Sequence, residues 1–434
     1  MLLWENSDNK HIMKMTNLTI PVFDQLYAEH EALWLADAFV TTEALARIAN
    51  MRSVIVSGDQ GAGKSALAHM LIHQTSESVD QTIWIVPWQP VYVSDTSQRT
   101  SAAQKYVEQI LLACTSTFLQ EIGSTPDTFS KSPAWIQELL RWFLHRYAPV
   151  NIEFSLSRLR PEITDAGYRL LHHLFSSEPS ELYHDYVSEK QVISDLMNAL
   201  QTIGVDGLWI IVDGLESWLE IDSTQLGTAL DILLSTLALF EVPGFALKIF
   251  VPSELTQVVL QSGGVYRRRL DVVRIEWSVE QLTKVVKKRL ILGTNESSFE
   301  ISDLADPDFI MAHLKKYGGN VPRGWLEMIR PFFDYYMIHE KNTLSKDTFL
   351  LIFQQEPPRV RISSKNLDVY IGYHHLGSFH HKQQECFNIY MSTMATTVPE
   401  KSSTIVQFKV RRKSHNQVTR STWMLMSGSR VSRT

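Results

Sequence analysis

The sequence is poor in cysteine, and it lacks both a long apolar segment and a leader-like start. Cys114 and Cys386 lie far apart, and neither belongs to a Cys-x-x-Cys pair, so neither a disulfide framework nor a cysteine zinc site is indicated. No apolar run reaches the roughly 18 residues of a membrane-spanning helix, and residues 1–14 show no basic stretch followed by an apolar one. We therefore expect a cytoplasmic protein without membrane segments.

Charge is distributed unevenly along the chain. A length of 434 residues suffices for two or three domains, and a hydrophobic content of 44% is that of a soluble globular protein. Residues 357–434 hold 12 Lys and Arg against 3 Asp and Glu, and subtracting this net of +9 from the formal total of −6 leaves −15 for the rest. Such charge asymmetry favours an acidic main part of the protein followed by a basic C-terminal domain that contacts nucleic acid. A solvated basic surface is the alternative.

Short apolar or β-branched runs alternate with helical patterns over the first two thirds of the chain. The expected strands cover residues 53–57, 82–86, 208–212, 246–251 and 272–277. Helical periodicity is expected at residues 64–73, 102–121, 133–147, 153–203 and 225–240. Strands separated by helices predict an α/β domain of three layers with a parallel sheet. From Ser278, a good helix cap, the pattern becomes all-helical to about residue 340.

A glycine-rich loop lies between the first expected strand and the helix that follows it. Residues 58–65 read Gly-Asp-Gln-Gly-Ala-Gly-Lys-Ser and fit the pattern G-x-x-x-x-G-K-[ST] in full. The glycines allow backbone N–H groups to turn inward and hold an anion at the helix N-terminus. The Lys64 ammonium can then reach the β and γ phosphates of ATP, while the Ser65 hydroxyl ligates Mg²⁺.

A strand–turn–helix junction that is merely rich in glycine is the alternative to a nucleotide site. The order of strand, loop and helix favours the nucleotide site. The residues predicted to contact the nucleotide here are Gly58, Gly61, Ala62, Gly63, Lys64, Ser65 and Ala66.

An acidic residue at the end of a second buried strand should complete the site. The apolar run 208–212 ends at Asp213, and we expect this strand beside that of the P-loop, so that Asp213 holds the Mg²⁺ shell through water. On its own, Asp213 would be an ordinary strand-end turn residue. Glu216 is the candidate to orient or deprotonate the attacking water, with Lys64 as its catalytic partner. Glu220 and Asp222 are rivals that are more typical of surface charges.

Over about residues 35–335 the chain resembles the AAA+ and STAND ATPases, including NACHT-like and origin-recognition-like members. Asp213-Gly214-Leu215-Glu216 resembles the Asp-Gly-Leu-Asp/Glu form of the Walker B motif in STAND proteins. This resemblance implies that Ser253, after the strand at 246–251, is a sensor of the γ-phosphate. It also implies that one of Arg267, Arg268 and Arg269 is an arginine finger toward a neighbouring subunit of a homo-oligomer. A solvated basic edge is the alternative for these arginines.

Gly318-Gly319-Asn320-Val321-Pro322-Arg323 resembles the Gly-x-Pro-Arg sensor 2 signature at the start of a lid helix. The glycines end one helix, and Pro322 begins the next at its first turn. Arg323 is thereby aimed at the triphosphate. The alternative is a helix–helix junction with a surface arginine. Sensor 2 would link the nucleotide state to the position of the lid, as in molecular switches.

Residues 359–434 resemble, in layout only, the winged-helix domain of response-regulator-type transcription factors. A short hairpin is expected over 359–376, and helices are expected over 382–394 and 416–426. The resemblance implies binding of double-stranded DNA with a recognition helix in the major groove. The side chains assigned to phosphates or base edges are Arg411, Arg412, Lys413 and Arg420. A partly disordered basic extension is the alternative.

The predicted fold class is α/β, with a three-layer P-loop NTPase core, a small helical lid and a C-terminal winged-helix-like domain. The predicted parts are a helical lead-in at 1–34, the core at 35–277, the lid at 278–345, a linker at 346–358 and the basic domain at 359–434. We predict an ATP-hydrolysing switch of the STAND/AAA+ type that controls a DNA-binding domain, which is a transcriptional regulator. One alternative is a DNA loader, transposition or phage-defence ATPase that acts as an oligomer. Another is a nucleotide-stabilised scaffold with little turnover.

Overall fold

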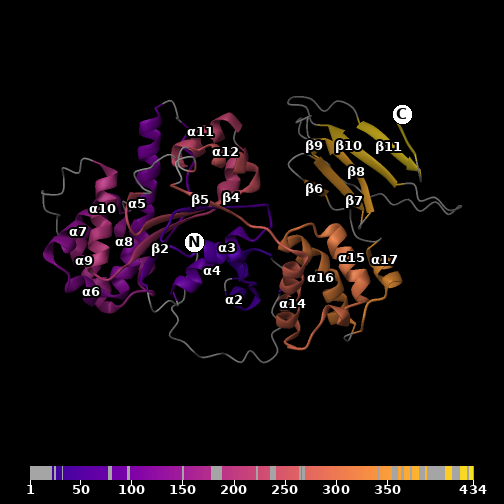
Figure 1. Cartoon of the computed structure of the whole chain (residues 1–434), viewed down its shortest axis with the longest axis horizontal. Helices are drawn as coiled ribbons and strands as arrows, with labels where there is room; N and C mark the ends of the chain where they lie inside the picture. The colour runs from indigo at the N-terminus through magenta and orange to yellow at the C-terminus, as the bar shows by residue number, and fades with distance from the viewer. Residues whose placement is uncertain are drawn as a thin grey trace. The chain divides into compact units, whose positions relative to one another are not determined.

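The structure of the chain is a computed structural model, shown in Figure 1. It describes residues 22–23, 26–31, 33–76, 81–94, 98–148, 151–176, 188–220, 223–234, 241–262, 265, 269–339 and 342–353, and the strands between residues 360 and 433. Two units compose the chain, Met1–Thr348 and Phe349–Thr434, and each is described by itself.

Five parallel strands form the centre of the first unit. They are β1 (Val54–Gly58), β2 (Ile83–Trp88), β3 (Gly207–Val212), β4 (Phe245–Pro252) and β5 (Asp271–Arg274). Every residue of β1, β3 and β4 is buried, as expected for parallel strands that are covered on both faces. The structure confirms all five expected strands, although β5 ends at Arg274 and not at Trp277.

The spatial order of the strands, β2-β3-β4-β1-β5, contradicts one prediction. β3, which precedes Asp213, does not lie beside the P-loop strand β1, because β4 lies between them. Ile55 of β1 pairs with Ile249, and Val212 of β3 pairs with the same residue from the other side. Sequence order alone does not fix spatial order in a sheet with helical crossovers. Asp213 still reaches the P-loop, since parallel strands end at one edge of the sheet.

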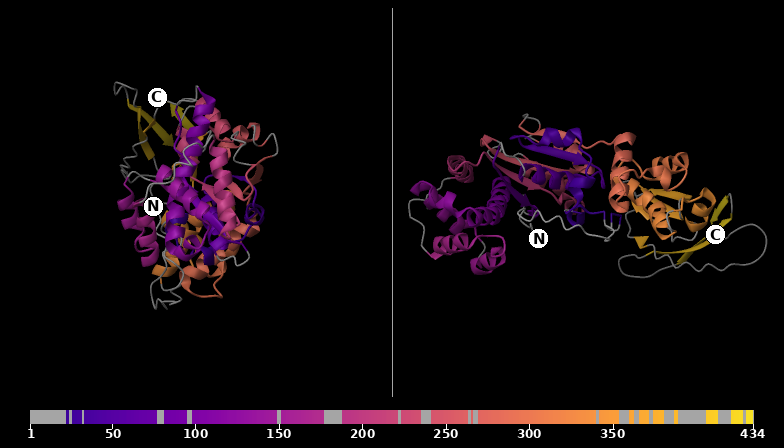
Figure 2. Two further views of the ribbon diagram at one scale, coloured as in Figure 1. Left: turned by 90° about the vertical axis from the view of Figure 1, so that its left-hand side faces the viewer. Right: turned by 90° about the horizontal axis from the view of Figure 1, so that it is seen from below.

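Helices cover both faces of this sheet (Figure 2). One face carries α3 (Glu43–Ile48) and α4 (Lys64–Ser76), and the other carries α5 (Arg99–Ser124), α10 (Glu189–Thr202) and α11 (Ser223–Leu234). Successive side chains of each strand point to opposite faces of the sheet, so every strand contributes to the core on both sides. In β3, Trp209 and Ile211 belong to the core under α4, whereas Ile210 and Val212 belong to the core under α5.

The regular elements that the structure describes between β2 and β3 are all helices. They are α5, α6 (Pro126–Ser130), α7 (Ala134–Tyr147), α8 (Ile152–Leu159), α9 (Asp165–Ser176) and α10. Helices α5 and α9 touch backbone to backbone, because a Cβ added to Gly167 would lie 1.8 Å from the Gly123 carbonyl oxygen. Phe118 and Phe143 pack at 5.1 Å between ring centroids, within the same core that covers the face of the sheet under α5.

Four described α-helices follow the sheet, and the first three lie within the predicted lid. They are α14 (Val279–Thr294), α15 (Pro307–Tyr317), α16 (Pro322–Ile338) and α17 (Lys346–Phe353). Ser278 caps α14 in a capping box with Gln281, which confirms the predicted helix start. Pro322 begins α16, as its fixed φ favours. Helix α17 occupies residues 346–353, where we expected a linker. None of the described helices combines the length and the apolar character needed to cross a membrane.

The described segments of the second unit after α17 are strands. β6 (Val360–Ile362), β7 (Asn366–Ile371) and β8 (His374–His380) form an antiparallel sheet, which confirms the expected hairpin. A second antiparallel sheet joins β9 (Phe387–Asn388), β10 (Val406–Arg412), β11 (Ser421–Ser427) and β12 (Arg430–Arg433) in the order β12-β11-β10-β9.

The helices predicted for the second unit are wrong where the structure describes them. Residues 421–426 belong to β11, and residues 387–388 belong to β9. The short run Trp423–Met426 is apolar without a period, so its pairing with β10 and β12 decides its conformation. Among the residues described after Phe353 no helix occurs, and the winged-helix layout is therefore not supported.

The side chain of Lys248 in β4 is fully buried. The described hydrogen-bond partners of its ammonium are backbone carbonyls, and none is a carboxylate. Its Nζ donates to the carbonyl oxygens of Asn50 at 2.5 Å and Arg52 at 2.6 Å, and it lies 4.4 Å from the centroid of the Trp209 ring. Lys248 pairs with Val54, the first residue of β1, so these bonds tie the α3–β1 turn to the sheet at the edge opposite the P-loop. Burial lowers the pKa of Lys248 to about 7.

Lys248→Met should change how stability depends on pH. Above pH 7 the folded chain releases the Lys248 proton, whereas the unfolded chain keeps it up to a pKa of 10.5. The free energy of unfolding of the parent protein should therefore rise relative to Lys248→Met between pH 7 and pH 9, by up to roughly 1.4 kcal/mol per pH unit. Urea unfolding at both pH values measures this difference.

Lys288→Met is the matched control, because the exposed Lys288 also donates to a backbone carbonyl, that of Phe39 at 2.7 Å. Its difference from the parent protein should not vary over this pH range. A constant difference for Lys248→Met would contradict the buried titration.

Candidate functional site

The glycine-rich loop connects β1 to α4, as the sequence predicts. Gly61 and Gly63 have φ angles of 80° and 91°, a region that favours glycine. A Cβ on Gly61 would also lie 2.9 Å from the Cβ of Arg323, which belongs to the lid helix α16. The loop therefore needs glycine at this position both for its own conformation and for the close approach of the lid.

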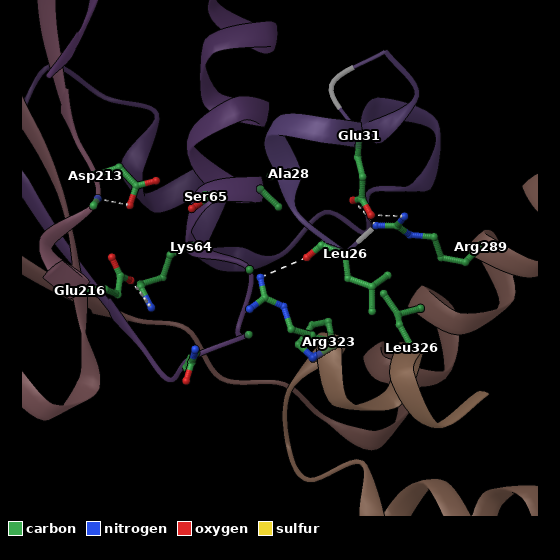
Figure 3. A pocket seen from close by; sticks show the side chains of 16 residues that line it. Leu26, Ala28, Glu31, Lys64, Ser65, Asp213, Glu216, Arg289, Arg323 and Leu326 are labelled. Carbon is green, nitrogen blue, oxygen red and sulfur yellow. Dashed lines mark hydrogen bonds and ion pairs between the residues drawn. The ribbon is translucent and has the colours of Figure 1, made fainter. Parts of the chain in front are cut away.

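Lys64 begins α4, and its ammonium lies inside the loop. The side chain is 6% exposed. Its Nζ donates to the carbonyl oxygens of Gly58 at 3.1 Å and Asp59 at 3.3 Å. The same Nζ lies 3.1 Å from Oε1 of Glu216, which belongs to the 3-10 helix η2 (Leu215–Glu220) after β3 (Figure 3). Lys64 thus connects the loop to the predicted catalytic carboxylate.

Asp213 lies beside Ser65 at the end of β3. The Ser65 side chain hydrogen-bonds to the Asp213 carboxylate, and the Gly214 N–H donates to Oδ1 of Asp213 at 2.9 Å. Burial raises the pKa of Asp213 above its usual value, whereas these two hydrogen bonds and the Lys64 charge act in the opposite direction. The structure thus brings together the two residues that we predicted as metal ligands.

These groups line one cavity of about 310 Å³. Its wall includes the loop and the first turn of α4 with Ala66, the turn that carries Asp213 and Glu216, and the start of α16 with Arg323. The segment of residues 26–31, which ends in α1 (Ala28–Glu31), contributes Leu26, Ala28 and Glu31. The volume is in the range of small-molecule sites.

Arg323 contacts both the loop and the N-terminal segment. Its backbone N–H donates to the Gly61 carbonyl at 3.3 Å, and its guanidinium donates to the Leu26 carbonyl at 3.1 Å. The guanidinium carbon lies 4.9 Å from the centroid of the Tyr27 ring. Arg323 is therefore at the cavity, as predicted from the sensor 2 resemblance, with a cationic head within the same wall as Lys64 (Figure 3).

A buried ion pair closes the far end of the cavity, and sequence reasoning missed it. Arg289 of α14 donates to both carboxylate oxygens of Glu31, at 2.7 and 2.5 Å. Their side chains are 7% and 4% exposed, and Arg289 lies over the Trp34 ring at 4.3 Å. The one signal in the sequence is an arginine within the apolar stripe of α14, beside Val286 and Leu290. Nothing local indicates its partner, because Glu31 is 258 residues away.

Other predicted site residues lie apart from the cavity or outside the described residues. Ser253 follows β4, which pairs with β1 at Pro252 and Gly58, but its hydroxyl bonds to Glu254 at 3.4 Å and it does not line the cavity described here. Arg269 pairs with Glu241 at 3.2 Å. Residues 267, 268 and 222, and the side chain of residue 220, lie outside the described part. The arginine finger stays a prediction.

Comparisons with known proteins add little to this geometry. No family model matches the sequence, and no curated protein does. The chain is similar to a solved structure of the ORC2 protein of Aeropyrum pernix, described as ADPNP-ADP complexes, with 13% sequence identity and a TM-score of 0.36. The similarity covers 75% of this chain and 69% of that chain.

Glu31→Gln should destabilise the first unit strongly. The exchange leaves the Arg289 guanidinium buried without a carboxylate, so the free energy of unfolding should fall by about 3–5 kcal/mol. Urea unfolding measures the loss. Glu31→Leu combined with Arg289→Met removes both charges and should recover much of it.

The exposed ion pair Glu280–Lys284, on helix α14 with Arg289, supplies the control. Glu280→Gln should change the free energy of unfolding by less than about 1 kcal/mol. Equal effects of Glu31→Gln and Glu280→Gln would contradict the special role of burial.

Proposed function

We propose that this chain binds ATP with Mg²⁺ and hydrolyses it in the cavity beside the glycine-rich loop. The observation that carries the proposal is the convergence of Lys64, Ser65, Asp213 and Glu216 on one cavity from two segments about 150 residues apart. A glycine-rich turn by itself would not require a buried lysine and two carboxylates at the same place. Loop N–H groups at a helix N-terminus supply the remaining phosphate ligands.

The donor set fits Mg²⁺. This ion prefers oxygen ligands, keeps several waters and takes only one or two protein groups at nucleotide sites. The hydrogen-bonded Ser65 hydroxyl and Asp213 carboxylate form such a set. Ser65 would ligate the ion and Asp213 would hold its water shell. Bound Mg²⁺ would neutralise charge on the β and γ phosphates.

The two carboxylates differ in their surroundings, and this difference suggests their roles. Asp213 is largely buried and accepts hydrogen bonds from Ser65 and the Gly214 N–H, which suits a fixed holder. Glu216 is 42% exposed on the cavity side, where water can reach it. We assign Glu216 to orienting or deprotonating the attacking water and Lys64 to the phosphate charge.

Glu216→Gln should bind ATP and fail to hydrolyse it. Turnover should fall by at least about 100-fold, because the base that activates water is lost. ATP affinity should stay equal or increase, since the carboxylate that pairs with Lys64 is gone. Phosphate release and equilibrium binding measure the two effects.

Glu220→Gln tests the rival carboxylate and should leave turnover unchanged. Normal turnover by Glu216→Gln with loss in Glu220→Gln would show that we assigned the wrong residue. Absence of ATP binding by the unsubstituted protein would overturn the proposal as a whole.

A switch in which nucleotide controls the lid is the second part of the proposal. Arg323 favours it, because its backbone bonds to Gly61 and its side chain lines the cavity. A phosphate group that draws the guanidinium away from Leu26 and Tyr27 would alter the lid at the first turn of α16. The lid position would then differ between triphosphate and diphosphate.

We propose that this switch regulates binding of double-stranded DNA by the basic second unit. The excess of basic residues after residue 357 supports the proposal, and Lys409, Arg411 and Arg412 fall on the single strand β10. Basic groups on strands bind phosphates without a recognition helix. A regulator and an oligomeric DNA-loading ATPase both require such binding.

The triple exchange of Lys409, Arg411 and Arg412 to Ala should weaken DNA binding by the full chain. The slope of log affinity against log salt should fall by about 0.9 for each phosphate that the variant no longer neutralises. A gel shift on duplex DNA at several salt concentrations measures this slope. Exchange of the exposed Lys105, Lys131 and Lys315 of the first unit removes the same charge and should have a smaller effect. Absence of any shift by the unsubstituted chain would remove the DNA proposal.

A further inference from the structure

The segment that joins the sheet to the lid lies directly behind the glycine-rich loop. After β5, the Ile275 N–H donates to the Ser57 carbonyl at 2.8 Å. The Trp277 indole Nε1–H donates to the Ala62 carbonyl at 2.9 Å. Its ring lies 4.0 Å from the place where a Cβ on Gly63 would be. Trp277 does not line the cavity described above. It therefore contacts the loop on the side that faces away from the cavity.

The bond from Trp277 determines which way one peptide group of the loop faces. The Ala62 carbonyl and the Gly63 N–H belong to the same planar trans peptide, in which C=O and N–H point in opposite directions. Holding the carbonyl against Trp277 therefore turns the Gly63 N–H away from the indole, toward the cavity. The preceding N–H, that of Ala62, is already used by the Asp59 carbonyl at 3.0 Å. Gly63 lines the cavity, so its N–H can meet a phosphate there.

We propose that Trp277 is a positioning residue for phosphate binding, which rests on the proposed binding of ATP. Its indole fixes the Ala62–Gly63 peptide so that the Gly63 N–H donates to a nucleotide phosphate. Ser278, the next residue, caps α14, so the same side chain connects the phosphate loop to the first lid helix. Together with the bond from Arg323 to Gly61, the lid and its hinge hold two successive carbonyls of the loop.

A packing role alone would make a different prediction for ligands that lack phosphate. Trp277→Phe keeps an aromatic ring at the hinge and removes only the indole donor. It should weaken ATP and ADP binding roughly five- to tenfold, as expected for a hydrogen bond that orients a donor to a charged group. Adenosine, which has no phosphate, should bind Trp277→Phe as it binds the parent protein. Calorimetric titration of the full chain with ATP and ADP, and competition with adenosine, provide these affinities.

Trp325→Phe is the matched control. The Trp325 indole also donates to a backbone carbonyl, that of Gly319 at 2.8 Å, but it does not contact the loop at Ala62. Its ATP affinity should be unchanged. Trp277→Tyr, whose hydroxyl can donate, should recover part of the ATP affinity. If Trp277→Phe does not fold, the affinities of Trp277→Tyr for ATP and for adenosine are compared instead.

The outcomes separate this inference from the proposed function. Unchanged ATP affinity in Trp277→Phe, or an equal loss for adenosine, would overturn the role of Trp277 while ATP binding by the parent protein stands. Failure of the parent protein to bind ATP would overturn the proposed function and this inference together. Selective loss of phosphate-dependent affinity supports it.

Discussion

The parallel register of β3, β4 and β1 determines the geometry of the candidate site. Both Val212 and Ile55 pair with Ile249, whereas Gly58 at the end of β1 pairs with Pro252. Measured along β4, β3 therefore ends three residues before β1 does, so the chain that follows β3 has room beside the end of β1, where the loop begins. Asp213 lies in this space and accepts a hydrogen bond from Ser65. Glu216 contacts Lys64 from the 3-10 helix that follows. A slip of one residue between these strands would reverse the faces and separate these groups.

Sequence reasoning succeeded where the determining interactions are local. The loop from Gly58 to Ser65, the cap at Ser278 and the helix start at Pro322 each follow from a few adjacent residues. The strands were found because parallel strands buried on both faces are continuous apolar runs. It failed where tertiary pairing decides the result. The place of β4 between β1 and β3, the partner of Arg289 and the strand at Ser421–Ser427 all depend on contacts between distant segments.

Within the candidate site, only part of the geometry was accessible from the sequence. The loop pattern predicted Lys64 and Ser65, and the end of a buried apolar run predicted Asp213 with Glu216 close behind it. The segment of residues 26–31 carried no such signal, since it contributes the Leu26 carbonyl and one partner of an ion pair, Glu31, to the wall. Trp277 likewise acts through one indole bond to a carbonyl, an interaction that no motif records.

The helical insertion between β2 and β3 has a consequence for how the chain folds. These strands are neighbours in the sheet, but Trp88 and Gly207 are separated by about 120 residues of chain, whose closure as a flexible loop is costly in entropy. Helices α5 to α10 share one hydrophobic core with the sheet, but contacts among themselves, such as that of Phe118 with Phe143, can form first. The prefolded helices then bring the two strand ends together. On this pathway the strand that precedes Asp213 would join the sheet late, and the proposed site would assemble only at that step.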